Sequence, residues 1–297
     1  MNKEFKSGFV TIVGKPNVGK STLMNAFIGE KVAIVSNKPQ TTRNKILGVF
    51  SQENSQIVFV DTPGIHTAKT KLGEFMAKSV NDAMKGMDVL LVLVEPGYIT
   101  EKDIEIAENM AKSNCPKILV INKVDTVKKE KVLSVMDQFK QYNFDVMVPI
   151  SAKNAEGLNV LQNTIENFLP AGPQYFPSDM ITDQPERLIC AEIIREKALL
   201  NLKDEIPHGI GIEIMKIETL RDDLVQIDAN VYCEKNSHKS IIIGKAGTML
   251  GKIGKEARID IENLLGNHVN LKLWVKVKED WRNQPLELLN LGYNNKN

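Results

Sequence analysis

The chain has 297 residues, 42% hydrophobic and 25% charged, so it fits two domains better than one and is ordinary for a globular protein. Its formal net charge of +1 excludes a global field that would draw it onto nucleic acid, so any such affinity must come from a local patch. The three cysteines lie far apart, which favours free thiols in a reducing cytosol, and the longest apolar run, Val89–Val94, is too short to span a bilayer.

In the first half of the chain, short β-branched runs alternate with amphipathic stretches. Several runs are continuously apolar, as expected for strands covered on both faces, and helices are predicted between them, for example at residues 101–112 and 129–141. This rhythm favours an α/β domain with a mostly parallel, doubly wound sheet over residues 1–171. The predicted strands are 10–13, 46–50, 57–60, 89–94, 118–121 and 146–150.

Residues 172–185 are turn-rich and polar, with several prolines, and we expect a linker there. The order of elements then changes, and residues 186–297 predict a smaller α+β domain. Its predicted elements are a helix at 186–202, strands at 211–218, 224–233 and 241–243, a Gly-x-x-Gly loop, a second helix and a last strand at 269–277.

A Gly-x-x-x-x-Gly-Lys-Ser pattern at residues 14–21 follows the first predicted strand and opens a helix, which is the context that a phosphate-binding loop requires. The glycines let backbone N–H groups converge on phosphate oxygens. Lys20 should reach the β- and γ-phosphates, and the Ser21 hydroxyl should bind Mg²⁺, whereas a glycine-rich turn capped by Ser21 is the alternative. The predicted nucleotide contacts of this loop are Gly14, Asn17, Val18, Gly19, Lys20, Ser21 and Thr22.

Two further segments are expected near the γ-phosphate. Asp61 follows a predicted strand and can hold Mg²⁺ through a water, and the Gly64 N–H can sense the γ-phosphate; a simple Pro-Gly turn is the alternative. Residues 31–43 are interpreted as a switch loop in which Thr42, or alternatively Thr41, completes the Mg²⁺ shell; a flexible surface loop would also fit. The residues assigned to catalysis are Asn17, Lys20, Thr42, Asp61 and Gly64, and those assigned to Mg²⁺ are Ser21, Thr42 and Asp61.

An Asn-Lys-x-Asp pattern at residues 122–125, after another predicted apolar strand, indicates which base is bound. The Asp125 carboxylate can accept two hydrogen bonds from the N1–H and 2-amino groups of guanine, and adenine lacks this arrangement. Lys123 can cover the base with its aliphatic stem, and Asn122 can tie the loops together. A backbone N–H for the guanine O6 is expected from the residues after the last strand of this domain, which are Ser151, Ala152 and Lys153.

Position 65 departs from a common pattern. Many small GTPases place a glutamine there to orient the attacking water, but Ile65 cannot hydrogen-bond to water, so slow unassisted turnover is expected. Asparagine at position 17 of the phosphate loop suggests a bound K⁺ that neutralises charge where an arginine finger would. We therefore hypothesise K⁺-stimulated hydrolysis through Asn17, with a turn-forming role as the alternative.

The Gly-x-x-Gly sequence at residues 244–247 leads into an amphipathic helix and is typical of a loop that clamps single-stranded RNA. Residues 235–258 contain six basic residues and one acid, which supplies the local patch, although a solvated helix face with a glycine turn is the alternative. The predicted RNA contacts are Ile243, Gly244, Lys245, Ala246, Gly247, Lys252, Lys255 and Arg258.

The last predicted strand alternates between two kinds of side chain. Leu271, Leu273, Val275 and Val277 are expected to face the core. The opposite face is interpreted as solvated with one covered tryptophan, and a basic and aromatic surface that stacks RNA is the alternative; its residues are Lys272, Trp274, Lys276 and Lys278.

Over nearly its whole length the chain resembles the Era family of bacterial GTPases with a C-terminal KH domain. The resemblance rests on residues 39–43, 61–66, 242–247 and 273–278. It implies a P-loop GTPase domain that binds GTP or GDP with Mg²⁺, followed by a type II KH domain. It also implies binding near the 3′ end of 16S rRNA, a role in assembly of the 30S subunit, and a cytoplasmic monomer with a fraction attached peripherally to the inner membrane.

Three functions are compatible with these patterns. The leading one is a GTP-hydrolysing assembly factor whose GTP and GDP forms differ in affinity for RNA or the ribosome. The second is a regulatory RNA-binding module that uses GTP only as a ligand, and Ile65 leaves this alternative open. The third is a signalling GTPase that binds a protein partner through its small domain. A rigid acidic loop in place of residues 244–247 would separate the third function from the first two.

Overall fold

The computed structural model describes residues 4–38, 40–65 and 68–293. Pro39 and His66, which belong to the patterns of the resemblance, lie outside the described residues. The chain forms two compact units. The first contains most of the chain up to Asp183, and the second contains the chain from Gln184 onward, with the additional segments Ile34–Thr41 and Ala68–Phe75.

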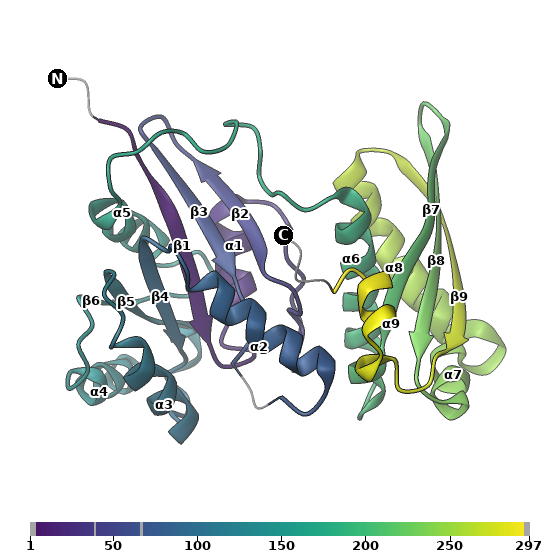
Figure 1. Ribbon diagram of the computed structural model, residues 1–297, viewed down its shortest axis with the longest axis horizontal. Coiled ribbons are helices and arrows are strands. Elements are labelled where there is room, and N and C mark those ends of the chain that lie inside the picture. The colour runs from purple at the N-terminus through teal and green to yellow at the C-terminus, as the bar shows by residue number, and fades with distance from the viewer. Residues whose placement is uncertain (1–3, 39, 66–67, 294–297) are drawn as a thin grey trace. The chain divides into compact units, whose positions relative to one another are not determined.

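The first unit is built on a six-stranded sheet with the strand order β2-β3-β1-β4-β5-β6 (Figure 1). Strand β2 is antiparallel to β3, and the remaining pairs of neighbouring strands are parallel. The prediction of a mostly parallel, doubly wound sheet is therefore confirmed. The strands are β1 (Lys6–Gly14), β2 (Ile46–Ser51), β3 (Ser55–Asp61), β4 (Val89–Val94), β5 (Lys117–Ile121) and β6 (Val146–Pro149).

Each face of this sheet has its own hydrophobic core, because successive side chains of a strand point to opposite faces. Ile12 packs in one cluster with Leu23 of α1, whereas its neighbour Val13 packs in a second cluster with Ile106 of α3. Helix α5 contributes to the first cluster, and α4 contributes to the second. The helices of this part of the chain are α1 (Lys20–Ile28), α2 (Lys71–Ala83), α3 (Glu101–Met110), α4 (Lys129–Phe139) and α5 (Leu158–Phe168).

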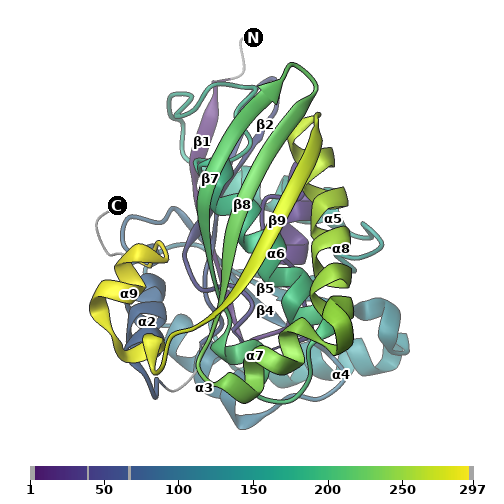
Figure 2. The ribbon, with the colours of Figure 1, turned by 90° about the vertical axis from the view of Figure 1, so that its right-hand side faces the viewer.

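The second unit contains a three-stranded sheet with the order β7-β8-β9, in which β8 is antiparallel to β7 and parallel to β9. Helices α6 and α8 lie against one face of this sheet (Figure 2), and their core side chains include Ile193, Ile253 and Ile261. The elements are α6 (Glu186–Asn201), β7 (Gly211–Arg221), β8 (Leu224–Cys233), α7 (Asn236–Ile243), α8 (Thr248–Leu265), β9 (His268–Val277) and α9 (Pro285–Asn290). Among the described residues, no helix is long and apolar enough to cross a membrane.

One predicted element of the second unit is wrong. Residues 241–243 were predicted as a strand, but they form the last turn of α7. Ile242 is fully buried, whereas its neighbour Ile241 is half exposed, and a helix that rests on the core with one face produces this pattern. Isoleucine favours strands only weakly, and burying Ile242 in the core stabilises the helix by more than this preference costs. Tertiary packing therefore determines that this segment is a helix.

The segment predicted as a linker lies along the first unit up to Asp183. The Val49 N–H donates to the Ile181 carbonyl at 2.8 Å, and the Thr182 hydroxyl donates to the Leu47 carbonyl at 2.7 Å. These bonds occupy backbone groups of the edge strand β2, and a covered edge is protected from pairing with other chains.

Candidate nucleotide and RNA sites

The phosphate-binding loop connects the end of β1 to the start of α1, as the sequence predicts. Its two glycines have positive φ angles, +154° at Gly14 and +99° at Gly19. A Cβ atom at Gly19 would lie 2.2 Å from the amide nitrogen of Asn122, and one at Gly14 would lie 2.6 Å from the Leu93 carbonyl oxygen. The loop therefore requires glycine at both positions, because it passes directly against the ends of the neighbouring strands.

The Lys20 side chain is buried and folds back over this loop. Its ammonium donates to the Lys15 carbonyl at 3.0 Å and to the Gly14 carbonyl at 3.3 Å. Burial lowers the pKa of Lys20 to about 8, although the nearby Asp61 carboxylate acts in the opposite direction. A phosphate beside this ammonium would favour its charged form, so the position suits an anionic ligand.

Two hydroxyls and one carboxylate meet where Mg²⁺ ligands were predicted. The Ser21 hydroxyl donates to Asp61 Oδ2 at 2.6 Å and lies 2.9 Å from the Thr42 hydroxyl, which is 3.4 Å from the same carboxylate oxygen. The Thr41 hydroxyl instead donates to the Lys38 carbonyl at 2.6 Å. Of the two candidate threonines, the structure thus brings Thr42 to the predicted metal site.

The environment of Asp61 fits a divalent cation. The carboxylate is fully buried, and burial raises its pKa, while Lys20 and the two hydroxyls act to lower it. Its Oδ1 atom has no hydrogen-bond partner among the described residues, which is costly for a buried carboxylate unless a cation binds it. Within the described ranges, no cluster of three or more His, Cys, Asp or Glu side chains could hold a metal ion.

The Asp-Thr-Pro-Gly turn rests directly on the phosphate-binding loop. A Cβ atom at Gly64 would lie 2.7 Å from the backbone of Pro16, so only glycine fits. The Ile65 N–H donates to the Gly14 carbonyl at 3.2 Å, and the Ile65 side chain packs on the core beneath α3 and α4. An isoleucine in this place has no group that can hydrogen-bond to water.

The base-recognition residues form one hydrogen-bonded set. Asn122 donates to the Val18 carbonyl at 2.8 Å and accepts from the Ala152 N–H at 3.0 Å, so it connects three loops as expected. The Ser151 hydroxyl donates to Asp125 Oδ1 at 2.6 Å. This bond fixes one oxygen of a carboxylate that is otherwise exposed.

Three other residues predicted for this site lie at its surface or edge. The Lys123 ammonium donates to the Asn17 carbonyl at 2.7 Å and also contacts the carboxylate of Glu95. Asn17 itself is exposed and has a φ angle of +66°, an uncommon conformation that asparagine tolerates well. Lys153 is exposed at the edge of the same loop set. No local sequence pattern indicates that Glu95, which follows β4, contacts the Lys123 ammonium.

Lys15 of the phosphate-binding loop forms an ion pair that was not predicted from the sequence. Its ammonium lies 2.7 Å from the buried Asp103 carboxylate and 3.3 Å from the Thr100 hydroxyl at the start of α3. Thr100 and Asp103 form a capping box, in which each side chain bonds the backbone of the other. The Thr-x-x-Asp spacing predicts such a cap, but the contact with a lysine in a distant loop is a tertiary feature.

The Gly-x-x-Gly loop of the second unit connects α7 to α8. Gly244 has φ +72° and ψ 174°, Gly247 has φ +79°, and Ala246 between them has φ +52°. These left-handed conformations bring the backbone to the surface at the N-terminus of α8, where N–H groups and the helix dipole favour anions. Lys245 and Ala246 are exposed.

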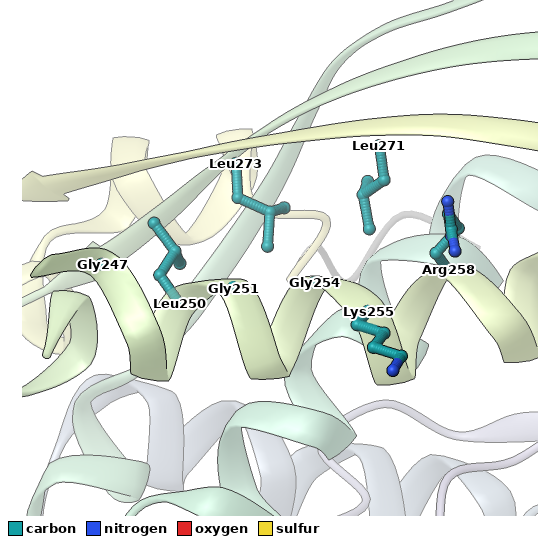
Figure 3. Close-up of a pocket in the computed structure, with 8 residues that line it drawn as sticks. All are labelled: Gly247, Leu250, Gly251, Gly254, Lys255, Arg258, Leu271 and Leu273. Carbon is teal, nitrogen blue, oxygen red and sulfur yellow. The ribbon is translucent and has the colours of Figure 1, made fainter.

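A groove of about 420 Å³ runs beside this loop between α8 and β9. Leu271 and Leu273 extend from β9 toward α8, and Leu250 extends from α8 toward them (Figure 3). The lining combines these apolar side chains with glycines and two cations, and it consists of Gly247, Leu250, Gly251, Gly254, Lys255, Arg258, Leu271 and Leu273. Apolar floors with flanking cations suit unstacked bases and their phosphates.

The structure brings some but not all of the predicted RNA contacts to this groove. Gly247, Lys255 and Arg258 line it. Lys252 is exposed on α8 with its ammonium 3.9 Å from Glu256, and it is not among the lining residues. Ile243 packs against the core of the unit instead. The glycines at 251 and 254, together with Leu271 and Leu273, were not assigned to RNA from the sequence.

Comparison with known proteins agrees with both sites. A family described as a 50S ribosome-binding GTPase matches residues 9–123, and a family described as a KH domain matches residues 205–282. Together with the phosphate-binding loop and the Gly-x-x-Gly loop, these matches define a P-loop GTPase domain followed by a KH domain. The expected fold class is therefore confirmed.

More specific relatives exist over the full length. The chain is 56% identical over 292 residues to GTPase Era of Alkaliphilus metalliredigens, which covers 97% of this chain and 99% of that protein. The chain belongs to the GTPase Era family and is a GTPase. A solved structure of Era with MgGDPNP and nucleotides 1506–1542 of 16S ribosomal RNA has a TM-score of 0.93 at 42% identity and covers 97% of this chain and 99% of that one. A solved structure of an Aquifex aeolicus Era variant bound to GDP·AlF₄⁻ has the same TM-score, sequence identity and coverage.

Proposed function

We propose that this GTPase binds 16S rRNA near its 3′ end and acts in assembly of the 30S subunit, with RNA binding and GTP turnover coupled. The observation that carries the proposal is the full-length likeness to an Era chain solved with MgGDPNP and nucleotides 1506–1542 of 16S rRNA. One matching family is named for the 50S subunit, but the RNA in that solved relative belongs to the small subunit.

In the nucleotide site, we propose roles that follow from the contacts of each side chain. Lys20, buried beside the loop carbonyls, would hold the β- and γ-phosphates. Ser21, Thr42 and Asp61 would hold Mg²⁺, which when bound neutralises developing charge on the phosphates. The Gly64 N–H would respond to the γ-phosphate, because its turn rests on the phosphate-binding loop.

For the base, we propose that Asp125 selects guanine, oriented by its bond from Ser151. Asn122 would keep the phosphate-binding loop and the loop at Ala152 together. With Lys123 bonded to the Asn17 carbonyl, the base and phosphate halves of the site are linked. These bonds exist between protein groups alone, so the site is largely formed in advance of nucleotide binding.

For RNA, we propose that the loop at residues 244–247 clamps the backbone of a few nucleotides, while Lys255 and Arg258 neutralise phosphates along the groove. The proposal is tested by measuring binding of a labelled strand that copies the 3′ end of 16S rRNA against a scrambled strand. Preferential binding of the first strand is expected. Equal binding of both strands would show that this chain does not read the 16S sequence.

We further propose K⁺-stimulated hydrolysis through Asn17. The support is the position of Asn17 in the phosphate-binding loop and the apolar Ile65 where a water-orienting glutamine is common. Turnover is expected to be faster in K⁺ than in Na⁺, and the difference should be absent in Asn17→Ala. Equal rates in both salts for the unaltered protein would contradict this idea.

The family resemblance supports three broader proposals. We propose a monomer that is mainly cytoplasmic, with a fraction bound peripherally to the inner membrane. We also propose a GTPase domain at 1–171, a connecting segment at 172–185 and a KH domain at 186–297. Light scattering of the purified protein tests the monomer, and fractionation of cells with and without a salt wash tests peripheral attachment.

A further inference from the structure

Strand β9 has two different faces, and only one of them belongs to the groove. Leu271 and Leu273 line the groove, whereas the alternate residues Lys272, Trp274 and Lys276 are exposed on the opposite face of the sheet. Trp274 is 45% exposed, which is unusual for so large an apolar side chain in the middle of a strand. The expectation of a solvated face with a covered tryptophan is therefore wrong for Trp274, whose ring is exposed.

Two lysines lie beside Trp274, and the neighbouring strand β8 places one carboxylate, that of Asp228, opposite Lys272. Neither Lys272 nor Lys276 has an ion-pair partner within the residues that the structure describes. Asp228, which stands opposite Lys272 on β8, accepts a hydrogen bond from the Gln226 side chain. The result is an aromatic ring between two exposed cations on one strand.

The face that carries Trp274 and the groove share strand β9, which lies at the edge of the sheet. Strand β9 is an outer strand of the sheet order β7-β8-β9, so no strand of the described sheet separates its two faces at that edge. Trp274 directly follows Leu273 in β9, and its side chain lies on the opposite face of the sheet. A nucleotide strand in the groove needs to pass only this edge to reach the ring.

We propose that Trp274, flanked by Lys272 and Lys276, is a second RNA-contacting surface that stacks a base flanking the nucleotides held in the groove. This inference rests on the proposed RNA binding. A groove with a Gly-x-x-Gly loop holds about four nucleotides, so a longer strand must continue over neighbouring protein surface. Aromatic rings beside cations are the usual platform for single-stranded nucleic acid, because every base has a face that can stack.

A protein partner fits this surface less well than RNA does. The core of a protein interface is depleted in charged residues, especially lysine. Here lysines lie on both sides of the single large apolar ring, so the surface favours a flexible polyanion with stacking groups over a packed protein surface.

Tryptophan fluorescence provides a selective test, since the chain has two tryptophans. Trp281 is fully buried and donates to the Gly209 carbonyl at 2.9 Å, so RNA at the surface should affect the emission of Trp274 alone. The full-length protein is titrated with a strand that only fills the groove and with one about three times longer. Quenching is expected with the long strand and not with the short one.

Affinities of variants complete the test. Trp274→Ala should weaken binding of the long strand about tenfold and leave the short strand unchanged, while Trp274→Phe should retain most of the affinity. Leu286→Ala, which removes an exposed apolar side chain from α9 in the same unit, is the matched control and should change neither affinity.

The outcomes separate the two claims. If the short strand binds but Trp274→Ala binds the long strand as well as the unaltered protein does, the second surface is refuted and the proposed RNA binding stands. If the unaltered protein binds neither strand, the proposed function fails first, and this inference fails with it.

Discussion

The nucleotide site and the RNA groove are built in opposite ways. Around the predicted phosphate and metal positions of the nucleotide site, the key polar side chains are buried: Lys20 is 6% exposed, and Asp61 is fully buried. In the groove, the cations Lys255 and Arg258 are exposed, and the floor is apolar. A ligand that must be positioned for chemistry requires a preformed polar site, whereas a flexible strand can be held by many weak surface contacts.

This difference has a consequence for substitutions. Removing one buried group from a preformed site leaves its partners unsatisfied, so single changes should have large effects. Removing one contact from an open groove leaves the others in place, so single changes should have small effects unless they alter the loop backbone. The predictions below test this contrast in order of expected effect.

Lys20→Met should give the largest effect, because it removes the buried ammonium at the predicted phosphate position while keeping a side chain of similar length. GTP turnover, measured as phosphate release, should fall about a thousandfold. Lys129→Met, at an exposed position on α4, is the matched control and should be unaffected. If Lys20→Met turned over GTP within a few fold of the unaltered protein, the phosphates would have to bind away from Lys20.

Asp125→Ala should give the next largest effect, since it removes a charged acceptor of two hydrogen bonds from guanine. Affinity for GDP, measured by calorimetric titration, should fall about a hundredfold, with a smaller preference over ADP. Asp137→Ala removes an exposed carboxylate of α4 that pairs with Lys140 and serves as the control. A retained preference for GDP would mean that other groups read the base.

An acidic loop, made by combining Lys245→Asp with Ala246→Asp, should weaken RNA binding by about tenfold or more through repulsion of the backbone phosphates. Intrinsic GTP turnover without RNA should not change. Lys203→Asp, an exposed charge reversal elsewhere in the second unit, is the comparison. Unchanged RNA binding by the acidic loop would favour a protein-binding role for this unit.

Lys15→Met should have the smallest effect of the four. It leaves the buried Asp103 without its cation, although Asp103 keeps its bonds to the Thr100 backbone N–H and hydroxyl. The free energy of unfolding, from urea denaturation, should fall by about 1–2 kcal/mol. Lys85→Met breaks an exposed ion pair with Asp82 and should lower the free energy of unfolding clearly less. Equal losses of unfolding free energy in the two variants would show that the buried ion pair stabilises the fold no more than the exposed one does.

Much of the fold and of the nucleotide site could be predicted because local patterns determine them. Strands β3, β4 and β5 are continuously buried, and the glycines of the phosphate-binding loop have a fixed spacing. The strand predicted at residues 241–243 failed because three isoleucines in a row carry no helical period. The ion pair of Lys15 with Asp103 joins residues far apart in sequence, and no local pattern encodes such contacts.

The groove was predicted less completely for the same reason. The Gly-x-x-Gly loop is a local signal, but the groove wall comes from β9, and its partnership with α8 is tertiary. The roles of Leu271 and Leu273 therefore could not be read from alternation alone, which gives them the ordinary role of core residues.

The most direct test of the account is GTP turnover by the purified protein in K⁺ buffer, with and without a strand that copies the 3′ end of 16S rRNA. Turnover is expected to be faster with that strand, with no stimulation by a scrambled strand and no stimulation of the acidic-loop variant. Unchanged turnover despite tight binding of the strand would contradict the coupling of the two sites, and the KH domain would then serve only as an anchor.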